Sequence, residues 1–288
     1  MKYRFIETCP QKYVVSRLCI LLGISRSAYY AWKKHKPSQR EQNNQALIGH
    51  IRRVYKKYRK TYGSPRVCAQ LKKEGIICNK KRVARLMRQD GLKGQRAYRK
   101  IITTDSKHDY PVAPNILNRE FQAEKPNQKW VADITYISTE EGWLYVAGVL
   151  DLFSRRIVGW DMSGKIDAAL VENALRMALY QRQPNKELLH HSDRGSQYAS
   201  HTIHNILTAN QITVSMSRKG NCYDNAVMES FWGTLKNEWV HHQKYYTRSQ
   251  ARTDIFGYIE GFYNTVRLHS SLGYLSPSEF EAKYQKSP

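Results

Sequence analysis

Long apolar runs are missing from this sequence of 288 residues. Their absence excludes a membrane-spanning helix, which needs about 18 consecutive apolar residues. An apolar stretch near the start, residues 18–24, is short, lies between Arg17 and Arg26 and lacks a good signal-peptidase cleavage site. It therefore predicts a core helix rather than an export signal, and we expect a cytoplasmic protein without a membrane partner.

Cysteine is almost as scarce, and its pattern disfavours two more classes of protein. The sequence has five cysteines, an odd number, and no two of them form a CxxC pair. This argues against a disulfide framework and against a zinc site, and it predicts reduced thiols in a cytosol. The residues concerned are Cys9, Cys19, Cys68, Cys78 and Cys222.

Negative charge is scarce too, and unevenly so. The sequence has 47 Lys and Arg against 24 Asp and Glu, a formal net charge of +23. Residues 1–125 hold 30 basic and 8 acidic side chains, whereas residues 126–288 hold 17 and 16. A polycation attracts phosphate backbones because each neutralised phosphate releases condensed counterions. We therefore expect the first part to bind nucleic acid; a solvated face without a partner and a surface for anionic lipid are the alternatives.

What is present in the basic part is helical periodicity. Between residues 13 and 34, apolar positions recur at helical spacing, a turn is expected at 23–25, and a basic helix from Arg26 to Lys34 follows. Helix, short glycine-containing turn and basic helix are typical of a helix-turn-helix, in which Arg26 would contact DNA. A plain helical hairpin is the alternative.

A second helical module is predicted over residues 44–93. Its last helix is expected from Lys80 to Gln89 after a cap at Asn79. Three arginines at positions i, i+3 and i+6 of that helix lie roughly along one face, which favours a stripe that contacts DNA phosphates over an ordinary solvated face. The helices are expected over 44–60, 64–75 and 80–89, and the arginines are Arg82, Arg85 and Arg88.

The pattern changes after Pro126, beyond a basic, aperiodic linker. Alternating and β-branched stretches predict the order βββαβαβα. This order yields a mixed five-stranded sheet with flanking helices, the arrangement of a ribonuclease-H-like domain, so the fold class is α/β with all-α modules before it. The strands are expected at 130–138, 143–151, 157–162, 187–192 and 213–217, and the helices at 167–183, 200–210 and 225–239.

Three acidic residues lie on elements that such a fold brings together. Asp133 interrupts an apolar strand, where an ionised carboxylate is costly unless a cation compensates it. Asp193 ends the fourth strand at the carboxyl edge of the sheet, and Glu229 lies one turn into a late helix. Each could singly be a cap or a surface charge. Asp151 and Asp161 are rivals: we interpret Asp151 as a turn residue or as a residue that supports the ligands from behind, and Asp161 as a surface residue.

Carboxylate oxygens are ligands for hard cations, so the predicted cofactor is Mg²⁺ or Mn²⁺, with two ions expected. Such a pair of ions serves an in-line phosphodiester displacement. The type, chain order and element placement of Asp133, Asp193 and Glu229 together favour this function more strongly than any one of them does.

The three acidic residues and several longer segments resemble those of a known family. The spacing Asp133, Asp193, 35 intervening residues and Glu229 resembles the DDE motif of transposases and retroviral integrases. The segments WVADITYI, HSDRGSQY, NCYDNAVMESFWGTLKNE, YGSPRVCAQLKKEG and YNTVRLHSSLGYLSPSEF resemble the second-reading-frame (OrfB) product of bacterial insertion sequences. The resemblance implies an integrase core and divalent-metal-dependent DNA strand transfer, with Asp133, Asp193 and Glu229 as the catalytic and metal-binding residues.

The resemblance also implies partners. In this family the full transposase usually arises by a frameshift that joins an upstream first-frame product, which supplies a helix-turn-helix and a leucine zipper. The sequence shows no sustained heptads, so two sources of end recognition stay open, the upstream product and the chain's own basic modules. Strand transfer at two DNA ends leads us to expect a homo-oligomer on double-stranded DNA.

Two residues near Glu229 are further candidates for DNA contact. Lys236 lies two turns after Glu229 on the same helical face and would meet a phosphate, with a solvated lysine as the alternative. Asn225 precedes the helix and would position DNA near the cut, although capping explains it almost as well.

These observations predict five segments and three competing functions. The leading function is a transposase that cleaves element ends; the alternatives are a catalytically idle DNA-binding regulator and a nuclease for RNA–DNA hybrids. The segments are a helix-turn-helix-like region at 1–36, a basic three-helix module at 44–93, a linker at 94–125, the catalytic core at 126–245 and a helical tail at 246–288.

Overall fold

The structure is a computed structural model that describes residues 2–9, 13–34, 36–95 and 112–286. Half of the expected linker, residues 96–111, lies outside the described residues. None of the helices in these ranges combines the length and apolarity needed to cross a bilayer.

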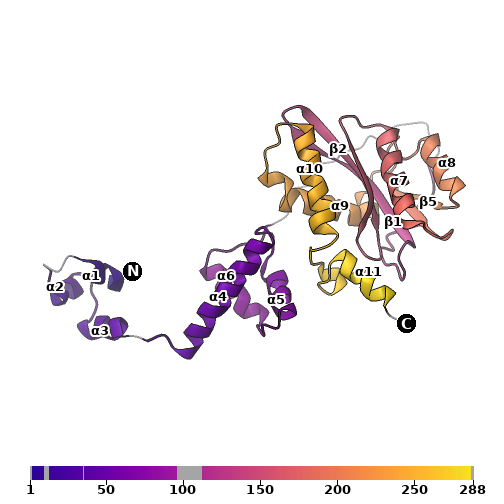
Figure 1. Ribbon diagram of the computed structural model, residues 1–288. Helices are drawn as coiled ribbons and strands as arrows, with labels where there is room; N and C mark the ends of the chain where they lie inside the picture. The colour runs from indigo at the N-terminus through magenta and orange to yellow at the C-terminus, as the bar shows by residue number, and fades with distance from the viewer. Residues whose placement is uncertain (1, 10–12, 35, 96–111, 287–288) are drawn as a thin grey trace.

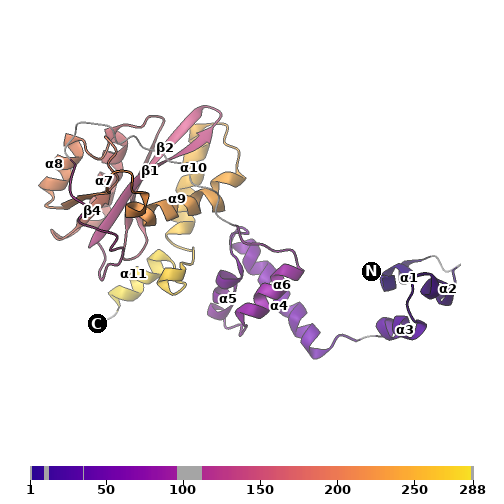
Figure 2. The ribbon, with the colours of Figure 1, turned by 180° about the vertical axis from the view of Figure 1, so that it is seen from behind.

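Three short helices form a small unit at the start of the chain. They are α1 (Lys2–Thr8), α2 (Val15–Leu21) and α3 (Arg26–Lys34), and both views show them apart from the other elements (Figures 1 and 2). Leu18, Cys19 and Tyr29 are buried between them. The turn expected at 23–25 is confirmed, with Gly23 at a φ of 61° that favours glycine.

The basic module consists of α4 (Gln39–Lys57), α5 (Ser64–Lys73) and α6 (Lys80–Gln89). The expected bounds of α6 are confirmed, and the Asn79 side chain caps it by accepting from the Lys81 N–H. The start expected for α4 was wrong: the helix begins at Gln39, because Ser38 and Glu41 form a capping box that satisfies its first N–H groups.

The second part is built on one five-stranded mixed sheet, as expected. The strand order is β3-β2-β1-β4-β5. β1 pairs antiparallel with β2 and β2 with β3, whereas β1–β4 and β4–β5 are parallel. The strands are β1 (Lys129–Thr139), β2 (Gly142–Asp151), β3 (Ile157–Ser163), β4 (Leu189–Ser192) and β5 (Thr213–Met216).

Helices cover both faces of this sheet (Figure 1). One face carries α7 (Ala168–Arg182) and α8 (His201–Ala209), and the other carries α9 (Ala226–Glu238) and α10 (Arg248–Tyr258). Side chains alternate along β1: Ala132 packs with the α7 side and Val131 with the α9 side. The alternation places Asp133 on the face that α9 covers.

The tail closes the edge of the sheet. The Asn264 amide bonds both the N–H and the carbonyl of Ile157 in the edge strand β3, at 3.0 Å each, and so occupies groups that a further strand would use. The tail thus packs against the core. The remaining elements are η1 (Cys222–Asn225), η2 (Val240–His242), the π-helical η3 (Ile259–Tyr263), η4 (Ser270–Leu272) and α11 (Pro277–Gln285).

The basic module is joined to the sheet domain by buried contacts. The Tyr62 hydroxyl accepts from the Leu268 N–H at 2.9 Å, and Arg66 pairs with Glu238 of α9 at 2.9 Å. Glu238 also binds Arg267, whose side chain is only 3% exposed, at 2.6 Å. One hydrophobic cluster therefore runs from α4–α6 into the α9 side of the sheet.

Candidate active site

The structure brings the three carboxylates within electrostatic reach of one another. Asp133 is half-buried in the middle of β1, Asp193 follows the last residue of β4, and Glu229 lies in the first turn of α9. Desolvation, followed by the charges of Asp193 and Glu229, raises the pKa of Asp133 well above its usual range. Such mutual repulsion is what a shared cation would relieve.

A glycine allows α9 to approach Asp133. Gly148 of β2 lies directly opposite Asp133 in the antiparallel register. A Cβ atom built on Gly148 would come within 2.7 Å of the Met228 methyl group and 3.0 Å of the Trp232 ring. Because Gly148 has no side chain, α9 packs close to the sheet and carries Glu229 towards Asp133.

The start of α9 is anchored to the strand that carries Asp133. The buried Asn225 donates from Nδ2 to the carbonyl of Ala132 at 2.9 Å. Its Oδ1 atom is buried and has no hydrogen-bond partner in the described part of the chain. Asn225 therefore holds Glu229 in register with β1; its predicted DNA contact stays a prediction.

The loop after β4 fixes the backbone around Asp193. The Asp193 Oδ1 atom accepts from the Gly195 N–H at 2.9 Å, and the Ser192 hydroxyl donates to the Asp193 carbonyl at 3.0 Å. The charges of Asp133 and Asp193, after burial, raise the pKa of Tyr198 far above its usual range. Tyr198 therefore keeps its proton and interacts with the charges of both aspartates.

A hydrogen-bond network around His191 supports the same loop. Ser215 Oγ accepts the N–H groups of Ile116 and Leu117, so its hydroxyl donates to His191 Nδ1 at 2.8 Å. The Nε2–H of His191 then donates to Ser217 Oγ at 3.1 Å. Burial lowers the pKa of His191 to about 4, so this tautomer is neutral and engaged at both nitrogens.

Lys236 lies close to the carboxylates. Its ammonium is 4.7 Å from the centre of the Tyr136 ring. Burial lowers the pKa of Lys236, and the charge of Asp133 opposes that shift. A half-buried cation that interacts with Asp133 is suitably placed to meet a phosphate, although its DNA contact stays a prediction.

The donor set fits a hard divalent cation. Carboxylate oxygens on three elements, the raised pKa of Asp133 and the unpartnered Oδ1 of Asn225 are all features that such an ion would stabilise. Among the described residues, however, no three His, Cys, Asp or Glu side chains converge into a complete metal cage. Like charges keep three carboxylates apart, so we expect the ion to draw them together.

The other candidate DNA contacts lie on the helical modules. Arg26 is exposed at the first position of α3. Arg82 donates from Nε to Asn44 at 2.9 Å, Arg85 donates to Gln89 at 3.3 Å, and Arg88 is exposed. Arg82 and Arg85 line a basic groove with four other polar residues, Arg40, Asn43, Asn79 and Lys81. Whether these arginines touch DNA stays a prediction.

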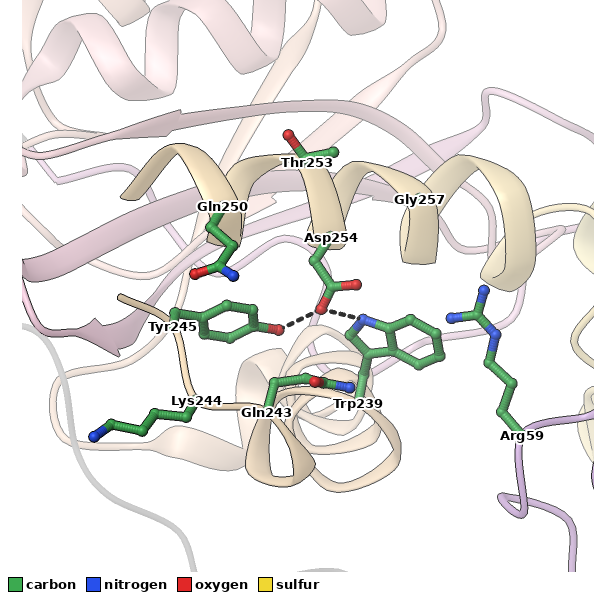
Figure 3. Close-up of a pocket in the computed structure, with 9 residues that line it drawn as sticks. All are labelled: Arg59, Trp239, Gln243, Lys244, Tyr245, Gln250, Thr253, Asp254 and Gly257. Atoms are coloured by element: carbon green, nitrogen blue, oxygen red, sulfur yellow. Dashed lines mark hydrogen bonds between the residues drawn. The ribbon is translucent and has the colours of Figure 1, made fainter. Parts of the chain in front are cut away.

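A cavity of about 500 Å³ lies at the joint between the basic module and α10 (Figure 3). Asp254 accepts from the Trp239 indole at 2.7 Å and from the Tyr245 hydroxyl at 2.6 Å. The Arg59 guanidinium lies 3.9 Å from the centre of the Trp239 ring. These contacts fix Trp239, the residue after α9, so we interpret the cavity as part of the joint between module and core.

The rival aspartates have structural partners. Asp151 is fully buried and accepts the N–H groups of Asn127 and Phe153, which makes it a turn residue as expected. Asp161 is half-buried and accepts from Asn173 at 3.0 Å.

Sequence reasoning missed two contributors to the site, Gly148 and Tyr198, and it did not identify the partners of His191. A glycine inside a strand pattern signals a close approach, and this signal was available for Gly148. Nothing local identifies Tyr198 or Ser215, because their roles depend on elements that meet only in the fold.

Three family models match the chain. The first, described as an integrase core domain, matches residues 123–222, and another of the same description matches residues 210–277. The third, an HTH-like domain, matches residues 42–100.

Curated relatives match nearly the whole chain. A 31 kDa protein of insertion element IS600 from Shigella sonnei is 46% identical over 93% of this chain and 99% of its own length. Transposase InsF for insertion sequence IS3A from Escherichia coli strain K12 is 39% identical over 98% of this chain and 99% of its own length.

Solved structures of viral integrases are also similar. A chain of a simian T-cell lymphotropic virus intasome is 14% identical with a TM-score of 0.47, over 77% of this chain and 71% of that one. The HTLV-2 integrase catalytic core domain in complex with magnesium is 14% identical with a TM-score of 0.42, over 54% of this chain and 97% of that one.

Proposed function

The chain belongs to the family of insertion-sequence transposases with an integrase core, and from this premise we propose that it cleaves element ends and joins their 3′-hydroxyls to target DNA. The observation that carries the proposal is that Asp133 of β1, Asp193 after β4 and Glu229 of α9 come together on the integrase core, where desolvation and then the charges of Asp193 and Glu229 raise the pKa of Asp133. Three carboxylates within interaction range on an integrase core are the donor set that phosphodiester chemistry with divalent ions requires.

The proposed reaction has two displacements at phosphorus. In the first, water attacks a phosphodiester at the element end, the bond to the 3′ oxygen breaks, and a 3′-hydroxyl is released. In the second, that hydroxyl attacks a target phosphodiester and a target 3′-hydroxyl leaves. Two Mg²⁺ or Mn²⁺ ions, when bound, would activate the attacking oxygen and stabilise the leaving one.

The chain's own residues hold and orient the reactants. Asp133, Asp193 and Glu229 supply the ligand oxygens, and Lys236 offers a cation for a phosphate beside them. Neither of the strand histidines is the general base: His191 is bonded at both nitrogens, and His190 is buried with its pKa lowered to about 4. A histidine of β4 is therefore not the group that accepts the proton of the nucleophile.

Double-stranded DNA is the proposed partner of the basic part. The HTH-like match at residues 42–100 and the excess of basic side chains in residues 1–125 support it through attraction to phosphates. Because two ends are joined, we propose a homo-oligomer, with the upstream first-frame product as a further partner.

A joining assay with an Asp193 variant tests the function. Purified chain is incubated with Mn²⁺ and an oligonucleotide that carries the element's terminal sequence, and joined products are counted. We expect Asp193→Asn to abolish joining and to leave DNA affinity nearly intact. Asp161→Asn, which removes a carboxylate bonded to Asn173, is the matched control and should join normally.

Three outcomes contradict the proposal. Undiminished joining by Asp193→Asn rejects the assignment of the site. A wild-type chain that binds ends but never joins them is a regulator, and preferential cleavage of RNA–DNA hybrids identifies a nuclease.

A further inference from the structure

Two arginines from distant segments meet on one buried carboxylate beside the candidate site. Arg119 donates from Nε to Asp224 Oδ1 at 2.8 Å. Arg218 donates to Oδ1 at 2.7 Å and to Oδ2 at 2.9 Å. The Asp224 side chain is fully buried, whereas those of Arg119 and Arg218 are 44% and 47% exposed.

The backbone that presents Arg119 is specifically shaped. Asn118 and Arg119 have φ angles of 39° and 66°, in the left-handed region that an arginine rarely adopts. Asn115 holds this turn, since its Oδ1 accepts from the Asn118 N–H and its Nδ2 donates to Asp224 at 2.9 Å. Such strain persists where the surroundings impose it, and it is common at functional sites.

Two guanidinium groups on one carboxylate leave a surplus positive charge. The shared interactions lower the pKa of Asp224 far below its usual range, so Asp224 is ionised and cancels only one of the two cations. Within the described ranges, Arg119 Nη1 and Nη2 and Arg218 Nη1 donate no hydrogen bond. These groups can bind a phosphate in the fork geometry that arginine favours.

The two arginines lie next to every element of the candidate site. Arg218 follows Ser217, whose N–H donates to the carbonyl of Ser192, the residue before Asp193. Asp224 precedes Asn225, which is bonded to the residue before Asp133. Tyr223, 68% exposed, lies 5.8 Å from the Arg119 guanidinium, so an aromatic ring accompanies the charge.

We propose that Arg119 and Arg218 form a clasp for a backbone phosphate of the DNA strand that enters the candidate site. Asp224 orients both guanidinium groups through its hydrogen bonds. The guanidinium N–H groups that Asp224 does not bind are then left for the phosphate. The inference rests on the proposed function only for the identity of the DNA, because the clasp binds the backbone.

The salt dependence of DNA affinity separates this role from mere neutralisation of Asp224. Arg119→Gln and Arg218→Gln are introduced together with Asp224→Asn, so that no buried carboxylate is left unpaired, and this triple variant is compared with the wild-type chain. Affinity for duplex DNA with the element's terminal sequence is measured against NaCl concentration, in EDTA so that joining cannot occur. We expect the triple variant to reduce the slope of log affinity against log salt by about 0.9, the value for the one phosphate contact that the clasp makes.

A matched control removes an arginine that has the same kind of partner elsewhere. Arg176 of α7 pairs with Glu172 at 2.8 Å and is 59% exposed. Arg176→Gln combined with Asp224→Asn should leave the slope unchanged. An unchanged slope for the triple variant overturns the proposal, as does a slope reduction of the same size in the control.

Should the triple variant fail to fold, modification of the wild-type chain with phenylglyoxal, read by mass spectrometry, tests the clasp instead. DNA should protect Arg119 and Arg218, and inorganic phosphate alone should protect them far less. Equal modification with and without DNA rejects the clasp, and equal protection by phosphate alone reduces it to a general anion site. These readouts need no joining, so the clasp and the transposase function succeed or fail separately.

Discussion

Asp133 lies between two buried apolar residues and faces two other carboxylates. A carboxylate in this position is ionised at neutral pH only at a cost in stability, which water cannot offset as it does at the surface. The pKa of Asp133 is raised in the fold, so the folded chain binds its proton more tightly than the unfolded chain does. Linkage then requires the free energy of unfolding to fall as pH rises from about 3.9, the ordinary aspartate value, towards the raised one.

This linkage predicts that Asp133→Asn stabilises the metal-free protein while it abolishes joining. In EDTA at pH 8 we expect an increase of about 1–3 kcal/mol in the free energy of unfolding, the usual cost of an uncompensated buried polar group. The gain should vanish near pH 4 and shrink on addition of Mg²⁺, which stabilises only the wild-type chain. Thermal unfolding of both proteins across this pH range measures the difference in the free energy of unfolding. A variant that is no more stable than wild type at pH 8 contradicts the prediction.

The secondary-structure elements show what the sequence could predict of the site. Alternation, caps and turn residues are local, and they located β1, β4 and α9 well enough to place Asp133, Asp193 and Glu229 correctly along the chain. The start of α4 was misplaced because the capping box at Ser38 was overlooked. The roles of Ser215 and Asp224 could not be read locally, since their partners lie far away in sequence: Asn115 and Asp224 are separated by 109 positions.

At this scale Gly148 decides how closely α9 approaches the sheet. We expect Gly148→Val to lower the joining rate at least tenfold, because the side chain meets Met228 and Trp232 and shifts Glu229 away from Asp133. Overpacking of this kind costs about 1–3 kcal/mol, so the fold should persist. Joining rates and urea unfolding curves measure the two effects.

Gly233, on α9 itself, provides the matched control. A Cβ there meets nothing closer than the Asn237 amide at 4.0 Å, and removing a helical glycine typically adds about 0.5–1 kcal/mol of stability. Gly233→Ala should therefore join normally. Full activity of Gly148→Val contradicts the proposed role of the close approach.

Over the whole molecule, the basic module and the helix that carries Glu229 share one set of buried contacts. Arg66 of α5 and Arg267 of the tail both bind Glu238, nine positions after Glu229 on α9. Arg59 and Trp239 extend the joint to the turn between α4 and α5 (Figure 3). The module that we propose to bind DNA is thereby held in a fixed relation to the carboxylates, which could not be inferred from the change in composition near residue 125.

Loss of this joint should free the module. We expect Arg66→Ala to make the chain more sensitive to limited proteolysis and to reduce the joining rate, with little change in DNA affinity, because the module keeps its own basic surface. Arg53→Ala, which removes an ion pair with Glu74 inside the module, is the control and should leave both unchanged. Wild-type protease resistance of Arg66→Ala would show that the contact does not fix the module.

Calorimetric titration of Mn²⁺ into the DNA-bound chain tests the shared metal site most directly. We predict saturable binding by the wild-type chain and by Asp224→Asn, and its loss in Asp133→Asn, Asp193→Asn and Glu229→Gln alike. Binding that survives unchanged in any one of those three variants would contradict the account.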